Sequence, residues 1–223
     1  MNSEIAKRGV FITLEGSEGC GKSTQIELLA RQLRAIGYRV RTLREPGGTP
    51  IGEEIRHTLK HSQNNHDMTP ETELLLMNAS RAQLVRQVIR PALEAGEVVV
   101  CDRFFDSTIA YQGYGRQLDL AMVKTVVDIA VGDTRPDLTL LLRVTPEISE
   151  LRRAMRQATM PFVRDRIEES DRAFFERVEK GFTAIAAAEP ERFRTVDASG
   201  AIDAVAGEIW RLVRPVLPKI GRW

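Results

Sequence analysis

The chain has 223 residues, of which 43% are hydrophobic and 28% are charged, and its formal net charge is +1. This composition is typical of a globular protein with a sizeable core. The small net charge argues against a nucleic-acid-binding protein, and no apolar run is long enough for a membrane helix. The first residues, MNSEIAKRG, lack the apolar stretch of a signal peptide, and the chain has only two cysteines, so we expect a protein of the reducing cytoplasm.

The first half of the chain alternates short apolar runs with amphipathic segments. Residues 10–15 (VFITLE) form an apolar run that ends at a glycine-rich loop, which is typical of a buried parallel strand. Apolar residues then recur at helical spacing over 22–36, and Gly37 is a suitable helix terminator. The same patterns predict strands at 40–43 and 97–102 and helices at 51–59 and 70–95.

The second half continues this alternation. It contains predicted strands at 138–144 and 193–196 and predicted helices at 119–131, from 146 onward, at 168–188 and at 201–216. Five strands that alternate with helices predict an α/β fold with a doubly wound, five-stranded parallel sheet, as in P-loop NTPases. No linker is evident, so we predict one domain over 1–223. Residues 152–166 are rich in arginine and contain Pro161, and we expect them to form a lid rather than core.

The stretch from Gly16 to Ser23 fits the phosphate-binding pattern G-x-x-x-x-G-K-[ST], between a predicted strand and a predicted helix as that motif requires. Glycines let backbone N–H groups turn toward phosphate oxygens, and the helix N-terminus adds positive potential. Lys22 would reach the outer phosphates, and the Ser23 hydroxyl would ligate Mg²⁺. The less specific alternative is a plain glycine turn. The predicted ATP-binding residues are Gly16, Ser17, Glu18, Gly19, Cys20, Gly21, Lys22, Ser23 and Thr24.

Glu18 introduces a carboxylate into this anion-binding loop, where it would repel phosphate. Two interpretations stay open: the side chain points into solvent, or it faces a second substrate and accepts a hydrogen bond from a sugar hydroxyl. The loop contains no arginine or lysine before Lys22. Charge on a transferred phosphoryl group would therefore have to be neutralised from elsewhere.

Asp102 and Arg103 end the third predicted strand, where parallel α/β sheets bind their ligands. Asp102 is placed to hold Mg²⁺, through water, and Arg103 to bind a second phosphate through two hydrogen bonds. A purely structural ion pair between the two is the alternative.

Three segments in this order, EGSEGCGKST (15–24), REPGGT (44–49) and DRFFDSTIAYQGYGR (102–116), resemble bacterial thymidylate kinases. RPDLTLLLRVTPE (135–147) and DRIEESDRAFFERV (165–178) extend the resemblance to about residues 9–217. It implies transfer of the γ-phosphate of ATP to dTMP, which yields dTDP and ADP on the route to dTTP. It also implies a homodimer, with the helix from Pro70 as a candidate face, and Mg²⁺ is the cofactor expected from Ser23 and Asp102.

The resemblance also implies roles for individual residues. Arg56 and Arg103 would hold the dTMP phosphate, Glu18 the sugar 3′-hydroxyl, and Glu45 would lie near the metal and the acceptor phosphate. The residues implied to contact the base or the sugar are Arg81, Thr108, Tyr111 and Gln112. Relatives usually carry a phenylalanine that stacks on thymine where this chain has Met77, a side chain that covers an aromatic face less strongly.

The arginines of the expected lid are Arg152, Arg153, Arg156, Arg164 and Arg166. A solvated basic helix face is the common explanation of such a cluster. Because the phosphate loop carries no arginine or lysine before Lys22, we instead expect Arg156, Arg164 and Arg166, as a group, to join Lys22, Glu18 and Arg103 as catalytic residues when the lid closes.

Two other functions fit this sequence less well. A regulatory GTPase needs an N-K-x-D guanine-binding motif, which the chain lacks, and its D-x-x-G match at 197–200 follows the fifth predicted strand, the wrong position. A kinase of another pyrimidine monophosphate is the nearer alternative. The preferred acceptor distinguishes it from a thymidylate kinase.

Overall fold

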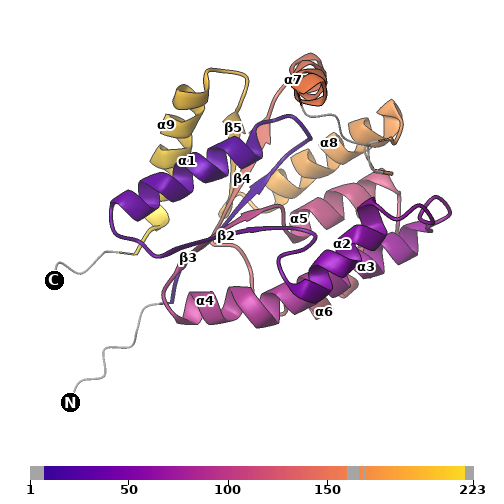
Figure 1. Ribbon diagram of the computed structural model, residues 1–223, viewed down its shortest axis with the longest axis horizontal. Coiled ribbons are helices and arrows are strands. Elements are labelled where there is room, and N and C mark those ends of the chain that lie inside the picture. Colours follow the sequence, from indigo (N-terminus) through magenta and orange to yellow (C-terminus); the bar gives the residue numbers. More distant parts are fainter. Residues whose placement is uncertain (1–7, 160–165, 168, 219–223) are drawn as a thin grey trace.

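The computed structural model describes residues 8–159, 166, 167 and 169–218, and at its centre lies a sheet of five parallel strands (Figure 1). The strands are β1 (Phe11–Glu15), β2 (Val40–Arg44), β3 (Val98–Asp102), β4 (Leu138–Arg143) and β5 (Phe193–Asp197). Their order in the sheet is β2-β3-β1-β4-β5, and Leu14 on β1 is aligned with Asp102 on β3. The predicted α/β fold with a five-stranded parallel sheet is confirmed. The loop after β1 and the residues after β3 consequently meet at one edge of the sheet.

Helices cover both faces of the sheet (Figure 1). One face carries α1 (Lys22–Ala35) and α9 (Ile202–Val213), and the other carries α3 (Pro70–Leu84), α6 (Leu120–Val131) and α8 (Arg172–Ala188). Neighbouring residues of β1 belong to different core clusters: Phe11 packs toward α3, α6 and α8, and Ile12 toward α1 and α9. Burial on both faces explains why β1, β3 and β4 are continuous apolar runs rather than alternating ones.

The long helical stretch predicted over 70–95 exists but is not uniform. It consists of α3, a π-helical turn over Val85–Ile89 and α4 (Arg90–Glu94). Pro91 lies in the first turn of α4, where it lacks an N–H to donate and would crowd an ordinary helical turn. The wider turn before it, in which Arg90 N–H bonds to Val85 O, allows the helix to continue.

A helical segment after β3 was not predicted. It consists of α5 (Phe105–Thr108) and a π-helical continuation over Ile109–Gly115. Glycines such as Gly113 and Gly115 are typical of turns, but here they allow close packing of the helix. A Cβ on Gly115 would lie 2.6 Å from Phe174 Cε2 on α8, and one on Gly113 would lie 2.7 Å from Leu120 Cδ2. The contact with α8, which is distant in sequence, determines the need for glycine.

Side-chain caps determine several helix boundaries. Thr49 accepts a hydrogen bond from Gly52 N, so α2 (Pro50–Lys60) begins at Pro50, and α2 then packs against α3. Asp171 accepts from Phe174 N at 2.7 Å, so α8 begins at Arg172 and not at 168 as expected; residue 168 itself lies outside the described residues.

The expected lid is described only in part. Helix α7 (Pro146–Thr159) continues through the first residues of the arginine-rich stretch, and 160–165 lie outside the described residues. Within the described chain, every helix is too short or too polar to cross a bilayer.

Candidate active site

The loop between β1 and α1 depends on glycines at positive φ angles. Gly16, Gly19 and Gly21 have φ values of 135°, 76° and 96°. A Cβ on Gly16 would lie 2.3 Å from Leu142 O, and one on Gly19 would lie 2.7 Å from Ser149 O on α7. Other residue types would therefore clash or be strained at these positions. The loop has the backbone form that the phosphate-binding motif requires, next to the N-terminus of α1.

Lys22 is buried inside this loop. Its Nζ donates to the carbonyl oxygens of Gly16 and Ser17, each at 3.0 Å, and lies 3.6 Å from Cys20 Sγ. Burial and the nearby Arg103 act to lower the pKa of Lys22, but the surrounding acidic groups outweigh them and the net shift is upward. The lysine thus stays protonated, as a phosphate-binding cation must.

Ser23 and Asp102 bring two oxygen ligands together at the edge of the sheet. Ser23 Oγ donates to Asp102 Oδ2 at 3.2 Å, although 79 residues separate the two in sequence. A hydroxyl and a carboxylate are donors that suit Mg²⁺, which also keeps water and phosphate ligands. No group of three or more His, Cys, Asp or Glu side chains suited to a metal occurs in the described parts of the chain. The pair therefore fits a metal that is shared with substrate phosphates, not one held by the protein alone.

Arg103 lies beside the phosphate loop in a left-handed backbone conformation, with φ of 69°. Its Nη2 donates to Glu18 Oε1 at 3.1 Å and its Nη1 to Ser107 Oγ at 3.0 Å, and the guanidinium lies over the Tyr111 ring. Burial alone would raise the pKa of Glu18, but Arg103, Lys22 and Lys60 hold it far below its usual range. Glu18 is thus a charged acceptor directed at Arg103 and not into open solvent.

The buried carboxylate of Glu15 holds the residues that contact Arg103. Glu15 accepts hydrogen bonds from Phe104 N at 2.7 Å and from Ser107 Oγ at 2.6 Å. Burial, together with the nearby Asp106, raises the pKa of Glu15 to about 7. Through Ser107, Glu15 fixes the position of the Arg103 side chain.

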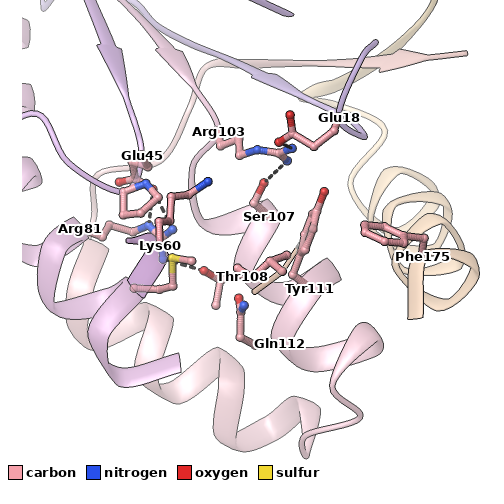
Figure 2. Close-up of a pocket in the computed structure, with 13 residues that line it drawn as sticks. Glu18, Glu45, Lys60, Arg81, Arg103, Ser107, Thr108, Tyr111, Gln112 and Phe175 are labelled. Atoms are coloured by element: carbon pink, nitrogen blue, oxygen red, sulfur yellow. Dashed lines mark hydrogen bonds and ion pairs between the residues drawn. The ribbon is translucent and has the colours of Figure 1, made fainter. Parts of the chain in front are cut away.

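A pocket opens next to the loop (Figure 2). Figure 2 shows Glu18 and Arg103 at one end and Thr108 and Gln112 at the other, with Tyr111 between them. One end is therefore charged, and the other carries neutral hydrogen-bonding groups among apolar side chains. The lining residues are Glu18, Glu45, Pro46, Lys60, Met77, Arg81, Arg103, Ser107, Thr108, Tyr111, Gln112, Ile167 and Phe175.

Arg81 and Glu45 form a buried ion pair along one wall of the pocket. Arg81 Nη2 lies 2.7 Å from Glu45 Oε2, and Arg81 Nη1 donates to Thr108 Oγ1 at 2.9 Å. Burial raises the pKa of Glu45, and Arg81 opposes that shift. Glu45 Oε1 is buried without a hydrogen-bond partner among the described residues. Arg56 lies at the pocket's edge, where its Nη1 donates to Pro46 O at 2.9 Å.

The structure separates the expected lid arginines. Arg166 pairs with Glu73 and donates to Met68 O, at the base of the pocket rather than at the phosphate loop. Arg152 Nη1 donates to Ala198 O at 3.0 Å, and Arg153 Cγ approaches Gly19, so these two lie over the loop. The side chain of Arg156 and all of Arg164 lie outside the described residues.

Several residues of the site did not emerge from the sequence. Lys60 follows Arg56 by one helical turn on α2, a spacing that could have revealed it, and its side chain enters the pocket toward Arg103 (Figure 2). Ile167 and Phe175 belong to a segment recognised only for its resemblance. Glu15 and Glu73 gave no signal, because their importance depends on partners that are distant in sequence.

Comparison with known proteins defines the family. A profile of the family described as thymidylate kinase matches residues 14–209, which include the phosphate loop and nearly all of the pocket-bearing elements. The chain belongs to the thymidylate kinase family. This kinase is 48% identical over 201 residues to a thymidylate kinase of Syntrophotalea carbinolica, a match that covers 90% of this chain and 93% of that protein. It is 50% identical over 205 residues to one of Alcanivorax borkumensis, with 92% and 96% covered.

A solved structure supports the same assignment. The crystal structure of a thymidylate kinase from Ehrlichia chaffeensis matches this kinase with a TM-score of 0.75 and 32% sequence identity, over 92% of this chain and 99% of that one. The predicted family, fold class and enzyme class, a nucleoside monophosphate kinase, are confirmed. The roles of the individual residues stay predictions.

Proposed function

We propose that this enzyme, as a single kinase domain, transfers the γ-phosphate of ATP to dTMP and so yields dTDP and ADP. The observation that carries the proposal is the position of Glu18, which belongs to the phosphate loop and also lines the adjacent pocket beside Arg103. A nucleotide in the pocket and a triphosphate on the loop would therefore meet at Glu18 and Arg103. This is the geometry that a monophosphate kinase requires.

The acceptor phosphate would bind at the charged end of the pocket. Arg103, Arg56 and Lys60 are the cations at or beside that end, and a guanidinium can bind a phosphate through two parallel hydrogen bonds. Glu18 would accept a hydrogen bond from the 3′-hydroxyl, and Tyr111 would crowd the sugar 2′ position.

The base would bind at the neutral end. Arg81 and Thr108 would face the carbonyl edge of thymine, and Gln112 the neighbouring N–H. Met77 would cover the ring face from α3, with Ile167 and Phe175 as further apolar lining.

The nucleophile is a phosphate oxygen of dTMP, which is anionic at neutral pH, so the reaction needs no strong general base. The protein has to align two anionic nucleotides and neutralise the charge that develops between them. Lys22 would do so from the loop, and Arg103 from the acceptor side. Arg156, Arg164 and, once released from Glu73, Arg166 would contribute from the lid, whose closure would also exclude water.

Ser23 and Asp102 would hold Mg²⁺, with Asp102 acting through water. When bound, Mg²⁺ supplies positive charge to the donor phosphates. The hydrogen bond between Ser23 and Asp102 supports this pairing, since it brings both oxygens to one point.

The test is an acceptor comparison. Purified enzyme with ATP labelled at the γ-phosphate and saturating Mg²⁺ should transfer label to dTMP with a higher kcat/KM than to dUMP, UMP or CMP. Label that never appears in thymidine diphosphate would overturn the proposal, and a better acceptor among the other three would change the substrate assignment.

We also propose a cytoplasmic homodimer. Leu75 on α3 and Met122 and Ile129 on α6 are exposed apolar residues of two helices that pack against each other, and such residues are candidates for a dimer contact. Both cysteines are unpaired, which suits a reducing compartment. Light scattering should give twice the 25.0 kDa chain mass, and Ile129→Lys should yield monomers; a monomeric wild type would refute the dimer.

A further inference from the structure

A buried carboxylate lies behind the neutral end of the pocket. Glu73 on α3 is completely buried and does not itself line the pocket. Its Oε1 accepts from Gln112 Nε2 at 2.7 Å, and its two oxygens accept from Arg116 Nε and Nη2 at 3.3 and 3.1 Å. Arg166 Nη2 also donates to Oε2. Glu73 therefore joins Gln112, which lines the pocket, to two arginines that do not line it.

The hydrogen bond between Gln112 and Glu73 determines the orientation of the Gln112 side-chain amide. An ionised carboxylate, here paired with Arg116 and Arg166, only accepts hydrogen bonds, so the NH₂ group of Gln112 must face it. The amide oxygen is then the polar atom available to a bound base. The chemistry of Glu73, and not only the atom assignment, thus makes Gln112 an acceptor.

A second charged residue determines the polarity of Thr108 in the same way. Arg81 only donates, and its Nη1 bonds to Thr108 Oγ1, so the Thr108 hydroxyl is free to donate its proton. Thr108 and Gln112 lie one helical turn apart at the same end of the pocket (Figure 2). Together they present one donor and one acceptor.

We propose that Glu73 is a positioning residue that sets the polarity of Gln112 and so selects a pyrimidine with an N3–H group. Thymine and uracil offer a carbonyl oxygen at C4 and an N–H at N3, which complement this donor and acceptor. Cytosine offers an amino group and an unprotonated N3 instead, so its N3 would face the Gln112 oxygen without a hydrogen bond. The inference rests on the proposed function and names the residue that governs base choice.

Glu73 could instead only anchor Arg116 and Arg166 near the start of α8. These two roles predict different kinetics. Loss of a structural anchor should reduce kcat/KM for every acceptor alike. Loss of the fixed orientation of the Gln112 amide should instead change the ratio of kcat/KM between acceptors.

The test substitutes Glu73→Gln in the full-length enzyme and measures kcat/KM for dTMP, dUMP and dCMP. A glutamine at 73 can accept or donate a hydrogen bond. The Gln112 amide can then flip, so that its oxygen faces residue 73 and its NH₂ group donates to N3 of cytosine. We expect the ratio of kcat/KM for dTMP to kcat/KM for dCMP to fall by about tenfold or more. A substrate that leaves a buried polar group of the site unpaired is disfavoured by at least this factor. The dTMP-to-dUMP ratio should stay within about twofold, because both bases carry N3–H.

Arg116→Gln is the matched control, because it perturbs the same cluster but leaves Glu73 ionised. It should leave the dTMP-to-dCMP ratio unchanged. An unchanged ratio in Glu73→Gln, or an equal change in Arg116→Gln, would overturn the proposal. If Glu73→Gln fails to fold, the double variant Glu73→Gln/Arg116→Gln is measured instead, because it removes one charge of each sign. It should lower the dTMP-to-dCMP ratio of kcat/KM to the same extent. An unchanged ratio in the double variant would also overturn the proposal.

The wild type separates this inference from the proposed function. If wild-type enzyme does not phosphorylate dTMP, the proposed function is wrong. If it prefers dTMP and the variants keep that preference, only the role of Glu73 is wrong.

Discussion

The side chains of Arg81 and Glu45 form an ion pair that is almost entirely buried, with exposed fractions of 3% and 4% and an Nη2–Oε2 distance of 2.7 Å. Removal of one partner leaves the other as an uncompensated buried charge, which typically costs about 3–5 kcal/mol. We therefore expect Arg81→Met to lower the free energy of unfolding by about that amount, measured by urea denaturation.

The matched control for this prediction is Arg172→Met, which breaks an exposed pair with Glu176. Such helical surface pairs contribute about 0.3–0.5 kcal/mol. Equal losses in the two variants would contradict the importance of burial at Arg81.

Arg103→Ala should reduce kcat/KM for dTMP by about 100-fold, because it removes the charge-assisted contacts of the acceptor phosphate. ATP binding, measured by titration calorimetry, should be nearly unchanged, since Lys22 and the loop remain. Arg211→Ala, which alters an exposed arginine on α9 that pairs with Glu208 in the same helix, is the control. Acceptor kinetics like those of wild type would rule out the phosphate-binding role of Arg103.

Lys22→Ala should abolish transfer, because Lys22 is the buried cation of the phosphate loop. A loss of kcat of about 100-fold or more is expected from removal of a charged transition-state contact. The fold should survive, since among the described residues Lys22 bonds to the loop's own carbonyls and to Cys20. Circular dichroism verifies folding, and near-normal turnover in a coupled ADP-release assay would contradict the assignment.

Met77→Phe should lower KM for dTMP several-fold, because an aromatic ring stacks on thymine with about 0.5–1.5 kcal/mol beyond simple burial. Phe175 and Tyr111 also line the pocket, so an aromatic side chain is compatible with its lining. KM for ATP serves as the internal control. A higher KM for dTMP would indicate that Met77 fills space that a ring cannot occupy.

Glu15 should make stability depend on pH. Burial, together with Asp106, raises its pKa from 4.5 to about 7, so between these values the folded state binds a proton more tightly than the unfolded state. The free energy of unfolding should therefore fall as pH rises through this range, by up to about 3 kcal/mol.

Glu15→Gln removes this titration. Its amide oxygen can accept from Phe104 N, and its NH₂ group can donate to Ser107 Oγ, which then accepts where it donated before. The stability of the variant relative to wild type should thus increase by about 1–3 kcal/mol between pH 5 and pH 8. Urea denaturation at both pH values measures it, and parallel pH profiles would refute the raised pKa.

Much of the fold and the phosphate loop could be predicted because their signals are local. The apolar runs of β1, β3 and β4 are recognisable without partners, since strands that are buried on both faces contain few polar residues. The loop from Gly16 to Ser23 is recognisable because one short segment supplies the turn, the cation and the hydroxyl.

Other features depend on contacts between residues that are far apart in sequence, and only the tertiary structure determined them. The need for glycine at 115 depends on Phe174 of α8, which leaves no room for a Cβ there. The orientation of Gln112 depends on Glu73, and the position of Arg166 at the base of the pocket depends on that same carboxylate. A carboxylate in a helix has no distinctive sequence pattern, because its effect arises from the donors that the fold brings to it.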